Sequence, residues 1–125
     1  MTIIETPIFK YEGSIINKKR NGFGKQLWKN TNEYYEGEWK DNKLNGSGIL
    51  ININKNTYCE GNFENNALNG IGKQRTTTFT CKHCGQKKFY LFTGEFVNGY
   101  VKKNSKKYLC IIKKNHVIRK QINNI

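Results

Sequence analysis

The sequence feature that most constrains the fold is a period of 24 residues that recurs in three sets of glycines. The sets are Gly13, Gly37 and Gly61; Gly22, Gly46 and Gly70; and Gly24, Gly48 and Gly72. A period of this length is typical of architectures in which one small supersecondary unit pairs with its neighbours. The chain, with 125 residues, has room for a short array of such units or for one ordinary domain.

Each unit has the composition of a β-hairpin. In the segment YEGEW (35–39), Tyr35, Gly37 and Trp39 alternate with two glutamates, which is the period of two that sends successive side chains to opposite faces of a strand. The segment KDNKLNG (40–46) then supplies turn formers, and Asn42 recurs as Asn66 and as Gly99, types that tolerate a positive φ. One hairpin alone is marginally stable, so the units must pair laterally into one antiparallel sheet.

Three units are complete, and a fourth is partial. The complete units lie near residues 11–24, 35–48 and 59–72, and the partial unit covers residues 92–99. The fourth opening, FTGEF, arrives 33 residues after the third opening instead of 24, so about nine residues have been inserted ahead of it. We expect this insertion, at about residues 76–89, to lengthen one hairpin.

The alternation also predicts which side chains share a face. One face carries two apolar ladders, Ile15, Trp39, Phe63 and Phe96, and Tyr11, Tyr35, Cys59 and Phe92, while the other face carries Glu12, Glu36, Glu60 and Thr93. Within a hairpin, Gly46 and Gly48 are expected opposite Trp39 and Gly37, where a missing side chain leaves room for a ring. The ladders are interpreted first as a core and second as a binding groove.

The pattern Y-E-G-E-W followed by G-x-G at this period resembles the MORN repeat, the "membrane occupation and recognition nexus" motif. The resemblance is clear over residues 11–73 and partial over residues 92–99. Ile15 stands where a tryptophan is expected, Cys59 replaces the tyrosine, and the fourth unit loses its G-x-G after Gly99. The first and last units therefore look like the caps of a short array.

The resemblance implies a binding and scaffolding module rather than an enzyme. In that family the concave aromatic face docks peptides, and binding to acidic phospholipids has been proposed. The residues that the resemblance assigns to a protein-binding groove are Tyr11, Tyr35, Trp39, Phe63, Phe92 and Phe96. The predicted fold class is all-β, a single elongated antiparallel meander of MORN hairpins over residues 1–99, followed by a basic capping hairpin over residues 100–125.

The insertion contains the segment CKHCG (81–85), which is the usual form of a zinc knuckle at a hairpin tip. Cys81 and Cys84 could both bind one Zn²⁺, and Gly85 allows the turn whose amides face the sulfurs. A closed site needs four ligands, so Cys110 and His116 complete the predicted set if the last hairpin folds back over the knuckle. The alternative is a pair of free thiols, and a redox role is less favoured because no βαβ pattern surrounds the motif.

The charge of the chain is concentrated in its second half. Residues 1–64 hold nine Lys or Arg and eight Asp or Glu, whereas residues 65–125 hold thirteen Lys or Arg and one acid, Glu95. This asymmetry indicates an anionic partner, either RNA or an acidic membrane surface. The candidate nucleic-acid contacts are Lys87, Lys88, Lys102, Lys103, Lys106, Lys107, Lys113, Lys114, Arg119 and Lys120, with Tyr90, Tyr100 and Tyr108 placed among them to stack on bases.

These observations favour a non-enzymatic adaptor without a small-molecule substrate, since no nucleophile, base and carboxylate pattern is present. The first hypothesis is that the sheet binds a protein segment while the basic half contacts RNA in a large ribonucleoprotein such as the ribosome. The alternatives are a membrane or cytoskeletal scaffold that binds acidic lipid or a partner peptide, and a protein scaffold whose charge is incidental. The chain shows no secretory signal or membrane span, so we expect a cytoplasmic protein with reduced cysteines.

Overall fold

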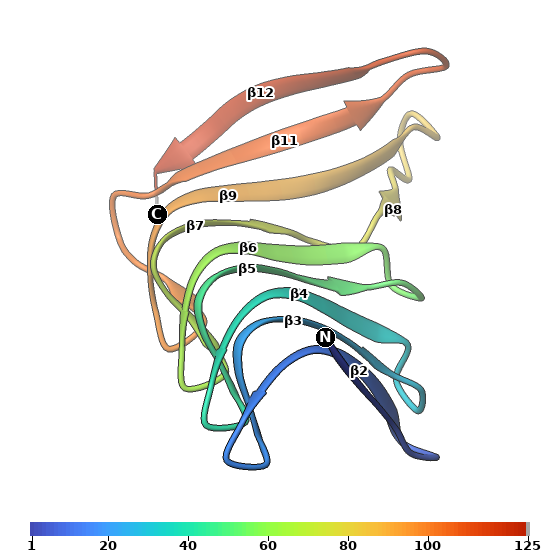
Figure 1. Ribbon diagram of the computed structural model, residues 1–125. Coiled ribbons are helices and arrows are strands. Elements are labelled where there is room, and N and C mark those ends of the chain that lie inside the picture. Colours follow the sequence, from blue (N-terminus) through green and yellow to red (C-terminus); the bar gives the residue numbers. More distant parts are fainter. Residues whose placement is uncertain (125) are drawn as a thin grey trace.

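The computed structural model describes the backbone of residues 1–124 and the side chains of residues 1–122. This part of the chain forms one open antiparallel sheet in meander order (Figure 1), so the predicted all-β fold is confirmed. The strands are β1 (Thr2–Glu5), β2 (Phe9–Ile16), β3 (Lys19–Trp28), β4 (Glu33–Lys40), β5 (Lys43–Asn52), β6 (Thr57–Glu64), β7 (Ala67–Arg75), β8 (Phe79–Thr80), β9 (Lys87–Val97), β10 (Tyr100–Val101), β11 (Lys106–Ile112) and β12 (Val117–Asn124). Within residues 1–124 no helix is long and apolar enough to cross a membrane.

The hairpin of each unit closes through a two-residue turn in which both residues have a positive φ. The four turns are Asn17–Lys18, Asp41–Asn42, Asn65–Asn66 and Asn98–Gly99. Two successive positive φ angles are the signature of the type I′ turn, whose twist matches that of the strands it connects. The turn positions that the sequence predicted are therefore confirmed.

The strand pairing inside each of the first three hairpins shifts at a β-bulge that the sequence analysis did not predict. Gly37 lies opposite Gly48 as predicted, but Trp39 lies opposite Leu44 and not opposite Gly46, because the register shifts between Gly37 and Trp39. The same shift occurs in the first and third units. A bulge adds a residue to one strand and bends it. The prediction that placed Gly46 opposite Trp39 is wrong for this reason, and Gly46 instead lies opposite Phe63 of the next unit.

The paired glycines make room for the tyrosine of their own unit. A Cβ at Gly48 would overlap the hydroxyl and ring of Tyr35, whose hydroxyl donates a hydrogen bond to the Glu38 carbonyl oxygen at 2.9 Å. Tyr11 repeats the arrangement, with its hydroxyl 2.8 Å from the Ser14 carbonyl oxygen. In the third unit Cys59 replaces the tyrosine, and the side chain of Leu68 reaches the glycine pair instead. The glycines therefore allow side chains to pack directly on the backbone.

The main core lies on the face that carries Tyr11, Tyr35 and Trp39, which we call the inner face. The strands from β2 to β9 bend toward their tight turns and form an arch (Figure 1), so this face is enclosed by the sheet itself. Tyr35 makes edge-to-face contacts with both Trp39 and Phe63, at ring-centroid distances of 5.3 Å. Trp39 also donates a hydrogen bond from Nε1 to the Gly24 carbonyl oxygen at 3.1 Å. We call the opposite face, with Glu12, Glu36 and Glu60, the outer face.

An asparagine in each middle turn fastens one unit to the preceding unit. Asn66 Oδ1 accepts a hydrogen bond from the Leu44 amide at 2.9 Å, while the Asn66 amide donates to the Leu44 carbonyl oxygen at 3.1 Å. Asn42 makes the equivalent pair with Arg20, at 2.9 and 3.0 Å. The fourth unit has Gly99 at this position, and its amide donates to the Leu68 carbonyl oxygen at 2.8 Å. A glycine has no side-chain oxygen, so this unit retains only half of the pair.

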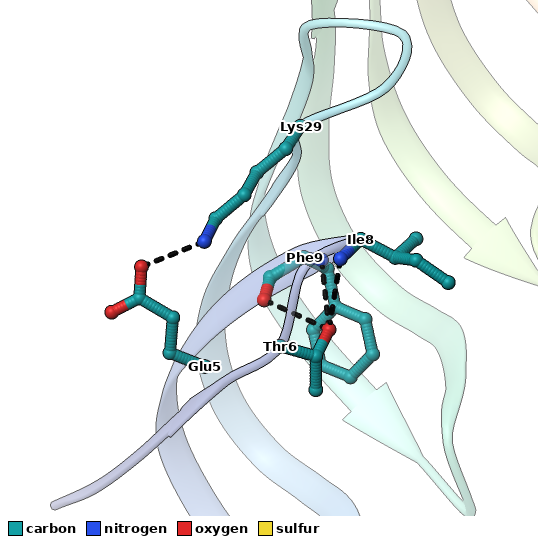
Figure 2. Close-up of polar contacts among 5 residues, drawn as sticks. All are labelled: Glu5, Thr6, Ile8, Phe9 and Lys29. Carbon is teal, nitrogen blue, oxygen red and sulfur yellow. Dashed lines mark hydrogen bonds and ion pairs between the residues drawn. The ribbon is translucent and has the colours of Figure 1, made fainter.

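The amino-terminal edge is closed by β1, a strand that the sequence did not predict. The turn between β1 and β2 is organised by Thr6, whose Oγ1 accepts hydrogen bonds from the amides of Ile8 at 3.2 Å and Phe9 at 3.0 Å (Figure 2). An ion pair at 2.7 Å between Lys29 Nζ and Glu5 Oε2 joins β1 to the end of β3. Local hydrogen bonding by the threonine hydroxyl is what turns the chain back here.

The carboxyl-terminal hairpin of β11 and β12 continues the sheet beside β9. The predicted carboxyl-terminal hairpin is confirmed and consists of these two strands, whereas Ile125 lies outside the described residues. In the fourth unit Ser105 occupies the position of the second glycine, and it is buried against Gly94. A second, smaller core forms on the outer face, where Phe89, Leu91 and Cys110 are buried.

Candidate functional site

The six residues predicted as a protein-binding groove lie together on the inner face, but most of them are core. Tyr11 and Tyr35 are fully buried, and Trp39, Phe63 and Phe96 are at most 4 % exposed, while Phe92 is half-buried. Aromatic rings that are this deeply buried hold the sheet together and offer little surface to a partner. A groove on this face must therefore be lined mainly by other side chains.

Such a lining exists in a cavity of about 300 Å³ on the inner face, between the first three units. Three strands and two turns contribute the wall residues Arg20, Gln26, Trp28, Glu33, Trp39, Asn42, Leu44, Leu50 and Asn66. The cavity thus combines two indole rings and two leucines with a cation, a carboxylate and three amide side chains. An apolar pocket with a few convergent polar groups is the usual form of a recognition site.

Arg20 is the most constrained polar group of this cavity. Its guanidinium lies over the rings of Trp39 and Phe9, with Cζ 5.0 and 5.3 Å from their centroids. Nη1 donates to Gln26 Oε1 at 2.5 Å, and Nε donates to Asn42 Oδ1 at 3.1 Å. All of these partners are uncharged, and among the described residues no carboxylate forms an ion pair with Arg20. Burial lowers the pKa of this guanidinium from its usual value, but arginine remains charged at all physiological pH values.

Sequence reasoning missed Arg20, although the repeat itself contains the signal. The positions 24 and 48 residues later are Leu44 and Leu68, and the matching position of the fourth unit is Val101. A lone cation in a column of apolar residues is a departure of the same kind as Cys59. Trp28, Glu33 and Leu50 could not be assigned without knowing how far each strand bends.

The four predicted zinc ligands are not brought together. Among the residues that the structure describes, no three His, Cys, Asp or Glu side chains are grouped in a way that could hold a metal ion. Cys110 is buried in the outer-face core beside Phe89, while His116 lies in the β11–β12 turn. The last hairpin extends the sheet and does not fold back over the knuckle. The expected arrangement, with Cys110 and His116 beside Cys81 and Cys84, is therefore not formed within the described chain.

Cys81 and Cys84 do lie at a hairpin tip, as predicted. The tip follows β8, which pairs with the start of β9. The Cys84 thiol donates a hydrogen bond to Gln86 Oε1 at 3.5 Å, while the Cys84 side chain, the backbone amides of Cys84 and His83, and Lys88 all lie near the Cys81 thiol. Together these groups lower the pKa of the Cys81 thiol to about 7. A lowered pKa favours the thiolate of Cys81, which is the form that binds metals and attacks electrophiles.

The predicted nucleic-acid contacts are distributed over both faces of the sheet. By the registers of β9, β11 and β12, Lys87, Lys106 and Arg119 lie on the outer face, Lys88, Lys107 and Lys120 lie on the inner face, and Lys102, Lys103, Lys113 and Lys114 lie in loops. Two of the three candidate stacking tyrosines already make cation–π contacts within the chain. Lys107 Nζ lies 4.3 Å from the ring centroid of Tyr90, and Arg119 Cζ lies 4.4 Å from that of Tyr108. Tyr100 is exposed.

Comparison with known proteins returned one family. The family model for the MORN repeat matches residues 11–33, 35–57 and 59–77, which together make up just over half of the chain. A search of curated proteins found no match. The matched segments coincide with the three complete units, and most of the cysteine-bearing insertion and all of the basic end lie outside them.

Proposed function

The chain belongs to the family of MORN-repeat proteins, and on this premise we propose that it is a scaffold that binds an extended segment of a partner protein in its inner-face cavity. MORN repeats generally mediate interactions with proteins or lipids. The observation that favours a protein segment is the cavity beside Arg20, because its walls combine indole rings with a pre-positioned guanidinium. Hot spots of protein interfaces are enriched in tryptophan and arginine in this way.

The chemistry of the cavity defines the segment that would fit. A carboxylate of the partner would face Arg20, whose positive charge has only uncharged partners among the described residues. Apolar side chains would pack on Trp28 and Leu50, and a hydrogen-bond donor would face Glu33, which lines the same cavity. Charge-assisted hydrogen bonds to a guanidinium are about twice as strong as neutral ones, so the acidic residue would contribute most to selectivity.

The ribonucleoprotein adaptor stays a prediction that rests on the charge of the second half. The basic side chains occupy both faces and the loops, so a single flat contact with RNA would use only part of them. The acidic membrane alternative rests on the same charge and on the family. A role without catalysis and a cytoplasmic location also stay predictions. Positive charge at this end would in any case accelerate the approach of an acidic partner.

Tryptophan fluorescence can test the proposal, because the only two tryptophans of the chain, Trp28 and Trp39, both line the cavity. We would titrate the full chain with an extended peptide that carries one glutamate between apolar residues, and with a matched peptide that has lysine in place of the glutamate. The proposal predicts a saturable change in emission for the acidic peptide and at least tenfold weaker binding of the lysine peptide. Equal responses to both peptides, or no response, would contradict it.

A further inference from the structure

The cysteine-bearing insertion forms a loop that is closed by its own backbone hydrogen bonds. The Cys81 amide donates a hydrogen bond to the Gln86 carbonyl oxygen at 2.8 Å, and the Gly85 amide donates to the Cys81 carbonyl oxygen at 2.8 Å. Gly85 has a φ of 69°, and this positive φ permits the turn in which its amide reaches the Cys81 carbonyl oxygen. These two bonds close the ring of residues 81–86 on the end of the β8–β9 ladder.

The loop presents two sulfurs to solvent in an arrangement that suits one metal ion. Cys84 is exposed and Cys81 is half-buried, and the hydrogen bond from the Gly85 amide to the Cys81 carbonyl oxygen holds both residues in one tight turn. Two thiolates with this spacing can both reach one Zn²⁺ at about 2.3 Å.

The rest of the chain leaves this pair incomplete. Cys110 faces an apolar core, and Cys59 is packed against the inner-face core. His116 belongs to the β11–β12 turn, which lies at the same end of the sheet as the β8–β9 tip (Figure 1), but among the described residues it does not group with the two thiols. Structural zinc sites are almost always closed by four protein ligands, so two ligands must come from outside the chain.

We propose that the β8–β9 tip is half of a zinc site, and that Cys81 and Cys84 from two copies of this chain bind one Zn²⁺ between them. A second copy brings an identical pair of thiols, and a two-fold axis through the metal generates a tetrahedral set. Each thiol loses its proton to solvent on binding, so the complex of one Zn²⁺ with four thiolates has a net charge of two minus. Lys82, Lys87 and Lys88 flank the pair in each copy and offset this charge.

The test is a zinc titration of the full chain, purified without a histidine tag and kept under reducing conditions. Bound metal and molecular mass are measured together, by elemental analysis and by sedimentation. The proposal predicts one Zn²⁺ for every two chains, a doubling of the mass with zinc, and its reversal by a chelator. Co²⁺ in place of Zn²⁺ should give the intense sulfur-to-metal absorption of a four-thiolate site.

Three variants separate this site from its alternatives. Cys81→Ser and Cys84→Ser lie outside both cores, so they should keep the fold of the sheet and lose both metal uptake and dimerisation. His116→Ala should change neither. Failure to bind Zn²⁺ would overturn the proposal, and so would a monomer that binds one Zn²⁺ per chain and loses it on His116→Ala. Zinc-dependent association that survives the loss of Cys81 and Cys84 would overturn it as well.

Discussion

The regular units of β2–β7 and the irregular end of β8–β12 form their buried cores in different ways. In the first two regular units a tyrosine lies across a glycine pair, in the third Leu68 takes this place, and asparagines join the middle turns to the preceding unit. In the fourth unit Ser105 replaces the second glycine, Gly99 replaces the asparagine, and Phe92 replaces the tyrosine. The main core then gives way to a smaller one on the outer face, around Phe89 and Cys110.

This difference shows what the repeat contributes. Strand pairing and the smaller outer-face core maintain the sheet through β11 and β12, whose sequences contain no glycine. The glycine pairs add an enclosed inner face, because a ring can pack against the backbone only where the side chain is missing. The inner-face cavity belongs to the regular units, whereas the cysteine tip and most of the charge belong to the irregular end.

The largest effect is expected from Trp39→Ala in the regular units. The ring is 4 % exposed and its Nε1 is bonded to Gly24, so its removal should lower the free energy of unfolding by about 3 to 5 kcal/mol. The matched control in the irregular end is Tyr100→Ala, because this ring is 80 % exposed. It should change stability by no more than about 0.5 kcal/mol in urea denaturation. Similar losses for both would show that the inner face is not the main core.

The next effect concerns the glycine pair itself. Gly48→Ser would place a Cβ against the ring of Tyr35, and we expect a loss of about 1 to 3 kcal/mol through overpacking. The reciprocal change, Ser105→Gly, imposes the regular pattern on the fourth unit, where a side chain is already accommodated. It should cost no more than about 1 kcal/mol, mainly in backbone entropy. If Gly48→Ser were the milder change, the role given to the glycine pairs would be wrong.

A smaller effect is expected when the turns of the two regions are exchanged. Asn66→Gly keeps a residue that accepts a positive φ but removes the oxygen that binds the Leu44 amide, which should cost about 1 kcal/mol. Gly99→Asn brings the same oxygen toward Leu68 and should raise stability by up to about 1 kcal/mol. Thermal unfolding of the two variants, compared with wild type, measures both. Destabilisation by Gly99→Asn would show that the fourth unit is spaced differently from the others.

Removal of the Tyr35 hydroxyl should give the smallest change in stability at neutral pH. This change should become larger at alkaline pH. Burial raises the pKa of Tyr35 to about 12, so the folded chain favours the neutral phenol. The stability that depends on this preference is present below pH 10 and is lost as the pH rises from about 10 to 12. Tyr35→Phe should remove the part of the stability loss between pH 10 and 12 that is due to this phenol. Unfolding measurements report the stability, and ultraviolet absorbance reports the ionisation of the phenol. An unchanged alkaline profile would contradict the burial of this phenol.

Most of the architecture could be predicted because it is periodic. Glycines in a fixed register, turn residues at a fixed offset and a period of two within YEGEW (35–39) leave few alternatives to a meander of hairpins. The tip that carries Cys81 and Cys84 followed from the length of the insertion alone. These are local properties of the chain, and a single sequence contains them in full.

The rest depended on geometry that the period does not determine. The bulge before Trp39 shifts its partner by two residues, from Gly46 to Leu44, and Gly46 pairs with the next unit instead. The burial of Cys110 follows from which face of β11 packs, and one step of register would reverse it. Arg20 stands out in its column of apolar residues, but the spacing does not show that this column lines a cavity. The site residues were therefore harder to predict than the fold.

The most direct test of the central claim is a comparison of binding by one acidic peptide to two variants, one from each region. Arg20→Leu adopts the residue of the second and third units and should fold, but it should weaken binding by about tenfold or more, as expected for a lost charged hydrogen bond. Replacement of Lys102, Lys103, Lys106, Lys113 and Lys114 by glutamine should weaken binding less than about threefold at physiological salt. Unchanged affinity for Arg20→Leu, with a large loss for the lysine variant, would contradict the claim that the regular units hold the binding site.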